Sequence, residues 1–131
     1  MNERKILIVD DEEIIRDILE QAFTRSNYTV RSAENAQMAL EILRGEKIQV
    51  MFLDLNMPGI NGLDLCRRIR EEYPISVIHA LTGHGSLFQL SDSRQAGFDD
   101  YFAKPVDLGV LYKAAEDAFE KIDMWNLSEE K

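Results

Sequence analysis

The sequence predicts an α/β domain built on a doubly wound, five-stranded parallel sheet. Three observations lead to this fold class: short continuous apolar runs, longer amphipathic runs, and their regular alternation along 131 residues. Continuous apolar strands separated by helices are typical of a parallel sheet that is covered on both faces. The alternation corresponds to five successive strand–helix units, and because crossover connections are right-handed almost without exception, a doubly wound sheet is the natural architecture. One domain of this length can bury a substantial core.

Five short apolar runs are the predicted strands. Each is rich in aliphatic or aromatic residues and is followed by a polar residue or a turn. In chain order the runs cover residues 6–9, 28–33, 50–53, 77–81 and 101–103.

Five amphipathic runs, one after each strand, are the predicted helices. Their apolar residues recur at every third or fourth position, which places them on one face of a helix. The second helix is predicted to end at Gly45 and the third before Pro74. A weaker fourth helix is predicted over residues 86–96, with Gly97 after it. The apolar face of the first helix consists of Ile14, Ile15, Ile18, Leu19, Ala22 and Phe23.

The apolar stripe of the fifth helix runs from Leu108 to Ile122. We therefore expect one domain over residues 3–122, followed by a tail or the start of a linker over residues 123–131. Met124 and Trp125 lie just past the stripe, in a frayed end or the first turn of a linker.

The composition excludes several classes of partner before any motif is considered. Asp and Glu outnumber Lys and Arg by 24 to 15, and the resulting net charge of −9 disfavours nucleic acid and anionic membranes. No apolar run is long enough to span a bilayer, and the polar N-terminus lacks a signal-peptide core. The single cysteine, Cys66, excludes an internal disulfide and a Cys-rich zinc site. We therefore expect a cytoplasmic location.

Chemically capable residues follow four of the five predicted strands. Asp10 and Asp11 follow the first strand, Asp54 the third, Thr82 the fourth and Lys104 the fifth. In a doubly wound sheet, ligands bind outside the carboxyl ends of the strands, so the topology gathers these side chains at one edge.

Three neighbouring carboxylates repel one another, and this repulsion favours the binding of a cation. At about 4 Å each pair costs roughly 1 kcal/mol in water and about 4 kcal/mol near a protein surface. Mg²⁺ suits all-oxygen ligands, whereas Zn²⁺ fits badly because both histidines lie on other segments than the acids. A cation, carboxylates, a lysine and a threonine hydroxyl around one point are the groups that proteins use to bind and transfer a phosphoryl group. A carboxylate can itself be the nucleophile and form an aspartyl phosphate.

Each of these residues also has an ordinary structural interpretation. Asp10-Asp11 can cap a helix, Asp54 can begin a turn, and Thr82 is a common strand residue. Lys104-Pro105 can be a simple strand exit, and Asn61-Gly62 can be turn chemistry. The functional interpretation is favoured because matching chemistry at four strand ends is a much rarer coincidence than at one.

Four motifs resemble the receiver domain of two-component response regulators (CheY-like). In order along the chain they are residues 6–12 (ILIVDDE), 53–62 (LDLNMPGING), 81–83 (LTG) and 101–105 (YFAKP). The resemblance covers about residues 3–122 and implies a flavodoxin-like (βα)5 fold with strand order 2-1-3-4-5.

The resemblance implies a role for each acid. Asp54 would accept a phosphoryl group from the phosphohistidine of a partner histidine kinase or phosphotransfer protein. Asp10 or Asp11, or both, would hold Mg²⁺ together with Asp54, directly or through water, and the backbone carbonyl of Asn56 would complete the protein ligands.

The resemblance also implies a switch. Thr82 and Lys104 would contact the phosphoryl oxygens, and the Lys104-Pro105 bond would be cis. Tyr101 would turn inward as Thr82 moves, which would change the surface of helix four, strand five and helix five for a downstream effector. A second copy of the chain is a further expected partner, in a homodimer that forms on phosphorylation. Asn56 and His84 would tune the lifetime of the phosphoryl group.

Two features depart from the commonest pattern of the family. His79 occupies a position in the fourth strand where an aliphatic residue is usual, and we expect a hydrogen-bonded core histidine there. The polar fourth helix argues against standard dimerisation through that face.

Two other functions require features that this sequence lacks. An enzyme of the haloacid-dehalogenase type needs an acid two residues after its nucleophile, where this chain has Asn56. A flavodoxin-type cofactor binder needs a phosphate loop after the first strand, where acidic residues 10–13 would repel phosphate. We therefore expect a signalling switch and not a dedicated enzyme, although it would catalyse its own phosphorylation and slow dephosphorylation.

Overall fold

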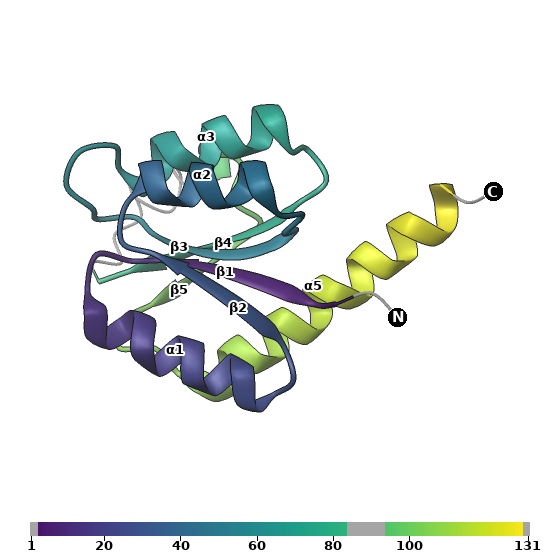
Figure 1. Cartoon of the computed structure of the whole chain (residues 1–131), viewed down its shortest axis with the longest axis horizontal. Coiled ribbons are helices and arrows are strands. Elements are labelled where there is room, and N and C mark those ends of the chain that lie inside the picture. Colours follow the sequence, from purple (N-terminus) through teal and green to yellow (C-terminus); the bar gives the residue numbers. More distant parts are fainter. Residues whose placement is uncertain (1–2, 84–93, 130–131) are drawn as a thin grey trace.

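The computed structural model describes residues 3–83 and 94–129, and it contains one five-stranded parallel sheet. The strand order is β2-β1-β3-β4-β5, which confirms the predicted doubly wound, flavodoxin-like topology (Figure 1). The strands are β1 (Lys5–Val9), β2 (Thr29–Ala33), β3 (Val50–Asp54), β4 (Val77–Thr82) and β5 (Asp100–Ala103).

Helices cover both faces of the sheet. In Figure 1, α2 and α3 lie on one face, and α1 and α5 lie on the other. Of the predicted fourth helix, only residues 94–96 fall within the described part of the chain, and these are helical. No helix among the described residues is long and apolar enough to cross a membrane. These helices are α1 (Glu13–Arg25), α2 (Ala36–Gly45), α3 (Gly62–Glu72) and α5 (Leu108–Glu129).

The strands separate two apolar cores. Side chains alternate between the faces of a strand, so Leu7 and Val9 of β1 pack toward α2 and α3. Ile6 and Ile8 pack on the other side with residues of α1 and α5. A strand that buries both faces reads as a continuous apolar run, which is why the periodicity was sufficient to predict it.

The predicted apolar face of α1 is too wide. Leu19 and Phe23 are buried, but Ile14 and Ile18 are 66% and 40% exposed. At 100° per residue, the six predicted positions span ~180° of the helix, and the sheet covers only part of that arc. Ile14 and Ile18 lie on the uncovered flank.

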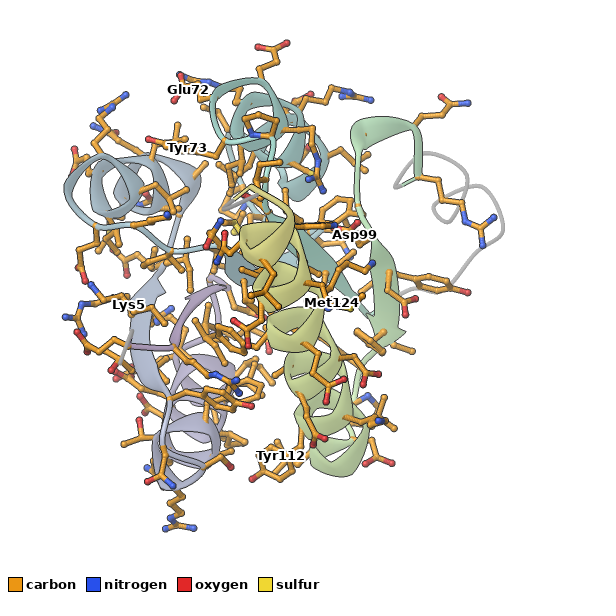
Figure 2. All side chains as sticks on the ribbon, turned by 90° about the vertical axis from the view of Figure 1, so that its right-hand side faces the viewer. Lys5, Glu72, Tyr73, Asp99, Tyr112 and Met124 are labelled. Atoms are coloured by element: carbon orange, nitrogen blue, oxygen red, sulfur yellow. The ribbon has the colours of Figure 1, made fainter. Side chains whose placement is uncertain are left out.

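Helix α5 continues beyond the end of its buried stripe. Residues 123–129, expected as a tail or linker, are helical, and Trp125 packs against the core on the α1 and α5 side. Figure 2 views the molecule from the side on which this helix projects, with Met124 labelled. Met124 and Leu127 are 68% and 61% exposed. A domain boundary after residue 122 stays a prediction.

His79 lies in the core, as expected. Its Nδ1 atom is 3.1 Å from the carbonyl oxygen of Met51, and its ring stacks on Phe52 with 4.4 Å between centroids. Burial lowers the pKa of His79 from its ordinary value, because the charged imidazolium loses its hydration there. His79 is therefore a structural residue held neutral by its surroundings.

Candidate functional site

Polar side chains gather at the carboxyl edge of the sheet. Asp10 follows β1, Asp54 ends β3, Thr82 ends β4, and Lys104 follows β5. Parallel strands that end at the same edge bring these residues together, although they are far apart in the sequence. Asp10, Asp54 and Thr82 are almost completely buried, whereas Asp11 is exposed.

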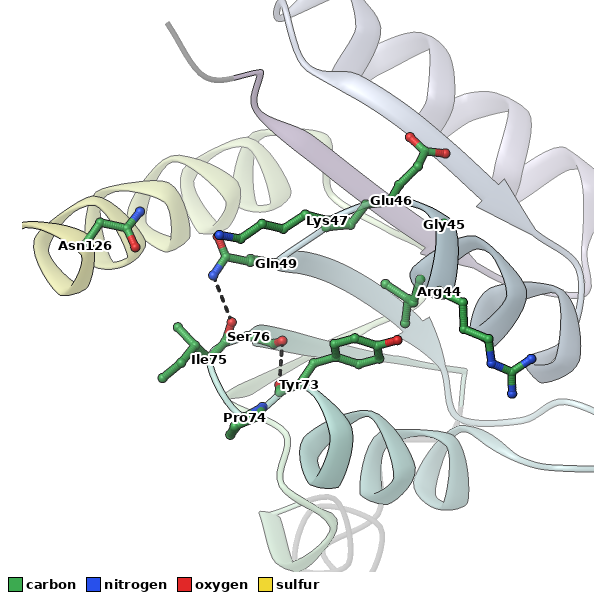
Figure 3. Close-up of a pocket in the computed structure, with 12 residues that line it drawn as sticks. Arg44, Gly45, Glu46, Lys47, Gln49, Tyr73, Pro74, Ile75, Ser76 and Asn126 are labelled. Atoms are coloured by element: carbon green, nitrogen blue, oxygen red, sulfur yellow. Dashed lines mark hydrogen bonds between the residues drawn. The ribbon is translucent and has the colours of Figure 1, made fainter. Parts of the chain in front are cut away.

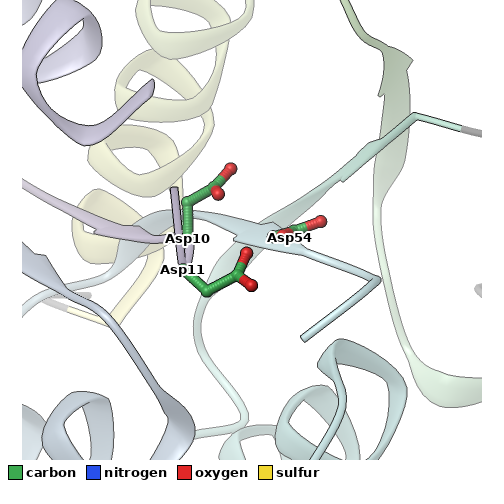
Figure 4. A group of neighbouring side chains, drawn as sticks. All are labelled: Asp10, Asp11 and Asp54. Atoms are coloured by element: carbon green, nitrogen blue, oxygen red, sulfur yellow. The ribbon is translucent and has the colours of Figure 1, made fainter. Parts of the chain in front are cut away.

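Three carboxylates from two strands form the centre of the site. One oxygen atom from each of Asp10, Asp11 and Asp54 lies within 4.8 Å of the others. Figure 4 shows Asp10 and Asp11 at the end of β1, with Asp54 beside them on β3. One cation can therefore reach all three.

Backbone hydrogen bonds orient the two buried acids. The amide of Glu12 donates to Asp10 Oδ1 at 2.9 Å, and the amide of Asn56 donates to Asp54 Oδ1 at 3.0 Å. Both bonds reach back two residues to the aspartate at the strand end, a local turn that short acidic side chains favour. One oxygen of each carboxylate is thus used by the turn, and the other remains for the site.

Gly62 is required by the close packing of the loop after β3. A side-chain carbon on this residue would collide with the carbonyl oxygen of Asp54, and its amide donates to the carbonyl of Leu55 at 3.3 Å. Asn61, the preceding residue, accepts a hydrogen bond from the amide of Asp64 at 3.0 Å and caps α3. The Asn-Gly pair therefore holds the start of α3 against the strand end that carries Asp54.

Lys104 supplies the positive charge. Its Nζ atom lies 2.8 Å from Asp10 Oδ2 and 3.6 Å from Asp54 Oδ1. Burial alone would lower the pKa of Lys104, but the contacts with Asp10 and Asp54 outweigh it and raise that pKa. The peptide bond between Lys104 and Pro105 is cis.

Asp54 holds its proton more strongly than an ordinary carboxyl group. Burial is the main cause and raises the pKa of Asp54 to about 7, with a further increase from the charge of Asp10. The Asn56 amide and the Lys104 ammonium oppose this increase. Without a second cation the pocket thus disfavours a third negative charge, as expected for crowded carboxylates.

Asp10 provides a direct test of whether a metal ion fits. Its Oδ2 atom is fully buried and accepts no hydrogen bond from the residues that the structure describes. The Lys104 ammonium lies 2.8 Å from this oxygen as an ion pair. A buried carboxylate oxygen that no backbone hydrogen bond uses can in addition coordinate a hard cation. The all-oxygen donor set fits Mg²⁺.

The remaining predicted residues lie around this centre. Thr82 is 1% exposed and accepts a hydrogen bond at its carbonyl oxygen from the Lys104 amide at 2.7 Å. Tyr101 is half-buried on β5 and packs against the core on the α2 and α3 side. Asn56 is exposed beside Asp54, and His84 lies outside the described residues.

Sequence reasoning missed one residue at the site. The guanidinium of Arg16 in α1 donates to the backbone carbonyl of Asp10 at 2.8 Å. A contact with a carbonyl oxygen leaves no residue-type signal in the sequence. The one available signal was an arginine within six residues of the aspartate pair.

A cavity lies away from these residues. Its volume is about 480 Å³, and it is formed by the turns before β3 and β4 together with Asn126 of α5 (Figure 3). It lies at the amino edge of the sheet, opposite the acids. Hydrogen bonds among its lining residues include Gln49 Nε2 to the Ile75 carbonyl at 3.1 Å and Ser76 Oγ to the Tyr73 carbonyl at 2.8 Å. The chemistry of the site is concentrated at the other edge.

Known relatives share this sequence pattern and fold. The family model described as "Response regulator receiver domain" matches residues 6–116. The response regulator protein PilR of Pseudomonas aeruginosa is 39% identical over 85% of this chain, which spans 25% of that protein. Sporulation initiation phosphotransferase F of Bacillus subtilis is 35% identical, with 88% of this chain and 93% of that protein covered.

Solved structures agree with the sequence comparisons. The signal receiver domain of an HD domain-containing protein from Pseudomonas fluorescens superimposes with a TM-score of 0.90 at 28% identity, over 94% of this chain and 99% of that one. A receiver domain protein (CheY-like) from Methanospirillum hungatei gives 0.89 at 27% identity, over 94% and 98%. The chain belongs to the receiver domain family of two-component response regulators.

Proposed function

We propose that this domain is a phosphoacceptor switch in which Asp54 receives a phosphoryl group from the phosphohistidine of a histidine kinase or phosphotransfer protein. The observation that carries the proposal is the position of the Asp54 carboxyl group. It lies at the carboxyl edge of the sheet, between two acids that can share a cation and a lysine 3.6 Å away.

The transfer would be an in-line displacement at phosphorus. A carboxylate oxygen of Asp54 forms the new P–O bond while the P–N bond to the donor imidazole breaks. The electron pair of that bond stays on the imidazole nitrogen, which takes up a proton. Asp54 must be deprotonated to attack. Its raised pKa leaves part of it protonated near neutral pH, so a nearby cation, which lowers this pKa, would favour the reactive carboxylate.

The ligands of the cation would be the side chains of Asp10, Asp11 and Asp54 and the backbone carbonyl of Asn56. Bound Mg²⁺ would neutralise negative charge on the phosphoryl oxygens and on the carboxylates during transfer. Lys104 would leave its contact with Asp10 or share it, and place its ammonium against a phosphoryl oxygen. Asp10 would stay fixed by the Glu12 amide throughout.

The signal would leave the site through Thr82 and Tyr101. Thr82 and Ala103 are register partners in β4 and β5, and Tyr101 lies two residues earlier on the same edge strand. A displacement of Thr82 toward the phosphoryl group would therefore act on the strand that carries Tyr101, and would change the surface formed by the predicted fourth helix, β5 and α5. Kinase and effector partners are proposed on this basis. We propose no binding of nucleic acid or membrane by these residues, a cytoplasmic location and no dedicated enzymatic activity.

The exposed residues Ile14 and Ile18 supply a contact surface for the phosphodonor. They lie in the first turns of α1, the helix that follows Asp10 and Asp11 in the sequence, and exposed apolar groups favour association with a partner protein. Substituting Ile14 by Ser should slow transfer from a donor protein and leave uptake from a small phosphodonor unchanged. The matched control is V110S, which removes a 46% exposed aliphatic side chain elsewhere.

The decisive experiment is incubation with a small phosphodonor and Mg²⁺, followed by measurement of intact mass. The wild-type protein should gain one phosphoryl group, D54N should gain none, and the control D17N, which removes an exposed acid of α1, should behave as wild type. A phosphoryl group on D54N would overturn the assignment of the acceptor.

A further inference from the structure

The side chain of Arg16 contacts a backbone carbonyl, although many acidic residues lie near it in the sequence. It follows four consecutive acids, residues 10–13, and precedes Asp17. Yet in the described part of the chain its guanidinium forms no ion pair within 4.0 Å. Its Nη1 atom donates instead to the backbone carbonyl of Asp10 at 2.8 Å. The side-chain contact of this arginine is thus with a peptide oxygen, although these five acids lie within six residues of it in the sequence.

This contact completes the restraint of Asp10. The Asp10 amide donates to the carbonyl of Ala33 at 3.1 Å, which continues the pairing of β1 with β2. Asp10 Oδ1 accepts from the Glu12 amide, and the carbonyl oxygen accepts from Arg16. Three of the four polar atoms of Asp10 are therefore fixed by hydrogen bonds, and the fourth, Oδ2, forms the ion pair with Lys104 at 2.8 Å.

The carbonyl of Asp10 belongs to the peptide group that joins Asp10 to Asp11. Fixing this group sets the direction in which both carboxylates leave the end of β1. Buried carbonyl oxygens need a partner, and β1 ends at Val9, so the strand ladder no longer supplies one at this position. Helix α1 supplies it from Arg16, in its first turns.

We propose that Arg16 is a positioning residue for the metal site: its hydrogen bond to the Asp10 carbonyl orients the Asp10–Asp11 peptide so that both carboxylates face Asp54. This inference rests on the proposed function for the identity of the cation. It adds a residue from α1 that touches neither the cation nor the phosphoryl group.

The proposal and a simple charge effect predict opposite changes in Mg²⁺ affinity. Removing a positive charge beside the acids would by itself strengthen Mg²⁺ binding a few-fold, because like charges repel. Loss of the positioning bond should weaken it. Residues that orient metal ligands typically change affinity by ten- to a hundredfold, so the positioning effect should exceed the charge effect.

The test is titration of Mg²⁺ into wild type, R16M and the matched control R25M, followed by the amide signals of Asp11 and Asn56 in NMR spectra. Arg25 is exposed in the last turn of the same helix, so R25M removes the same charge and side-chain type without touching Asp10. We expect the Kd for Mg²⁺ to rise about tenfold in R16M and to stay within twofold in R25M. An unchanged or lower Kd in R16M overturns the proposal.

A second variant keeps the test valid if R16M folds poorly. R16Q is polar and favours a helix, but its amide is too short to keep the contact, and the same rise in Kd is expected. Thermal unfolding in a chelator separates a loss of stability from a loss of metal affinity. If wild type binds Mg²⁺ normally and fails to take up phosphate, the proposed function fails while the Arg16 proposal stands on its Kd values. A wild-type protein that binds no Mg²⁺ overturns both.

Discussion

The ammonium of Lys104 lies 2.8 Å from a buried oxygen of Asp10, across the carboxyl edge of the sheet. The two residues are far apart in the sequence, and their contact joins the end of β1 to the segment that follows β5. In the absence of a metal ion, this contact is the main compensation for the buried negative charge of the site.

Replacing Lys104 by Met should therefore destabilise the metal-free protein. Removing one partner of a buried ion pair costs about 3–5 kcal/mol, because the remaining charge is left uncompensated. The free energy of unfolding should fall by roughly this amount in a chelator, and Mg²⁺ should restore part of it. Chemical denaturation with and without Mg²⁺ measures both changes, and equal losses in the two conditions would contradict the pairing.

K104R tests the signalling role of the same residue. A planar guanidinium keeps the charge but cannot replace a compact ammonium between two carboxylates and a phosphoryl group. We expect phosphate uptake to be reduced less than output, measured as binding of the phosphorylated domain to its effector. Full output from K104R would remove Lys104 from the coupling between site and surface.

The pKa of Asp54 predicts how stability depends on pH. In the folded protein this pKa is raised to about 7, from an ordinary value of 3.8. The folded state therefore keeps a proton that the unfolded state has lost between these values, and the free energy of unfolding falls as the pH rises through this window. D54N has no proton to lose, so near pH 8 in a chelator it should be more stable than wild type by about 1–3 kcal/mol.

Comparison of D54N with wild type at two pH values provides the check. The stability difference should shrink as the pH falls and vanish near pH 3, below the ordinary pKa of 3.8, where both states of the wild-type protein are largely protonated at this position. Mg²⁺ at ten times its Kd should stabilise the wild type at pH 8 by about 1.4 kcal/mol through mass action, and D54N by less. A stability difference that does not change with pH would contradict the raised pKa.

Gly62 and Gly45 form a matched pair for testing the loop after β3. A methyl group at Gly62 would strike the Asp54 carbonyl, whereas Gly45, the last residue of α2, has no atom within 4 Å of its added carbon. G62A should lower the free energy of unfolding by about 1–3 kcal/mol and weaken Mg²⁺ binding, while G45A should change neither appreciably. Equal effects of the two substitutions in thermal unfolding would argue against the close approach.

The sequence was sufficient to predict the features that depend on local pattern. Strand positions followed from apolar runs, and the gathering of Asp10, Asp54 and Lys104 followed from strand order. The exposure of Ile14 and Ile18 did not, because the width of the buried arc is set by the neighbouring elements. The end of α5 also escaped prediction: the apolar stripe stops where the sheet stops, but residues 123–129 contain no helix breaker, so the helix continues.

The buried imidazole of His79 should make the domain sensitive to acid, independently of the metal site. Its ring lies between Phe52 and Phe102, with 4.4 and 5.8 Å between centroids, and burial lowers its pKa below the ordinary 6.5. The unfolded state therefore binds this proton first as the pH falls below about 6.5, and the folded state loses stability progressively.

In H79F the aromatic stack is kept and the titrating group is removed. The slope of unfolding free energy against pH between 6.5 and 5 should be shallower in H79F than in wild type, as measured by urea denaturation at several pH values. Asp54 has the opposite effect, because its raised pKa increases the free energy of unfolding as the pH falls. The comparison is therefore sharpest in the D54N background, where Asp54 no longer titrates and the His79 contribution remains. Parallel slopes for D54N and D54N/H79F would show that the imidazole keeps its ordinary pKa in the folded protein.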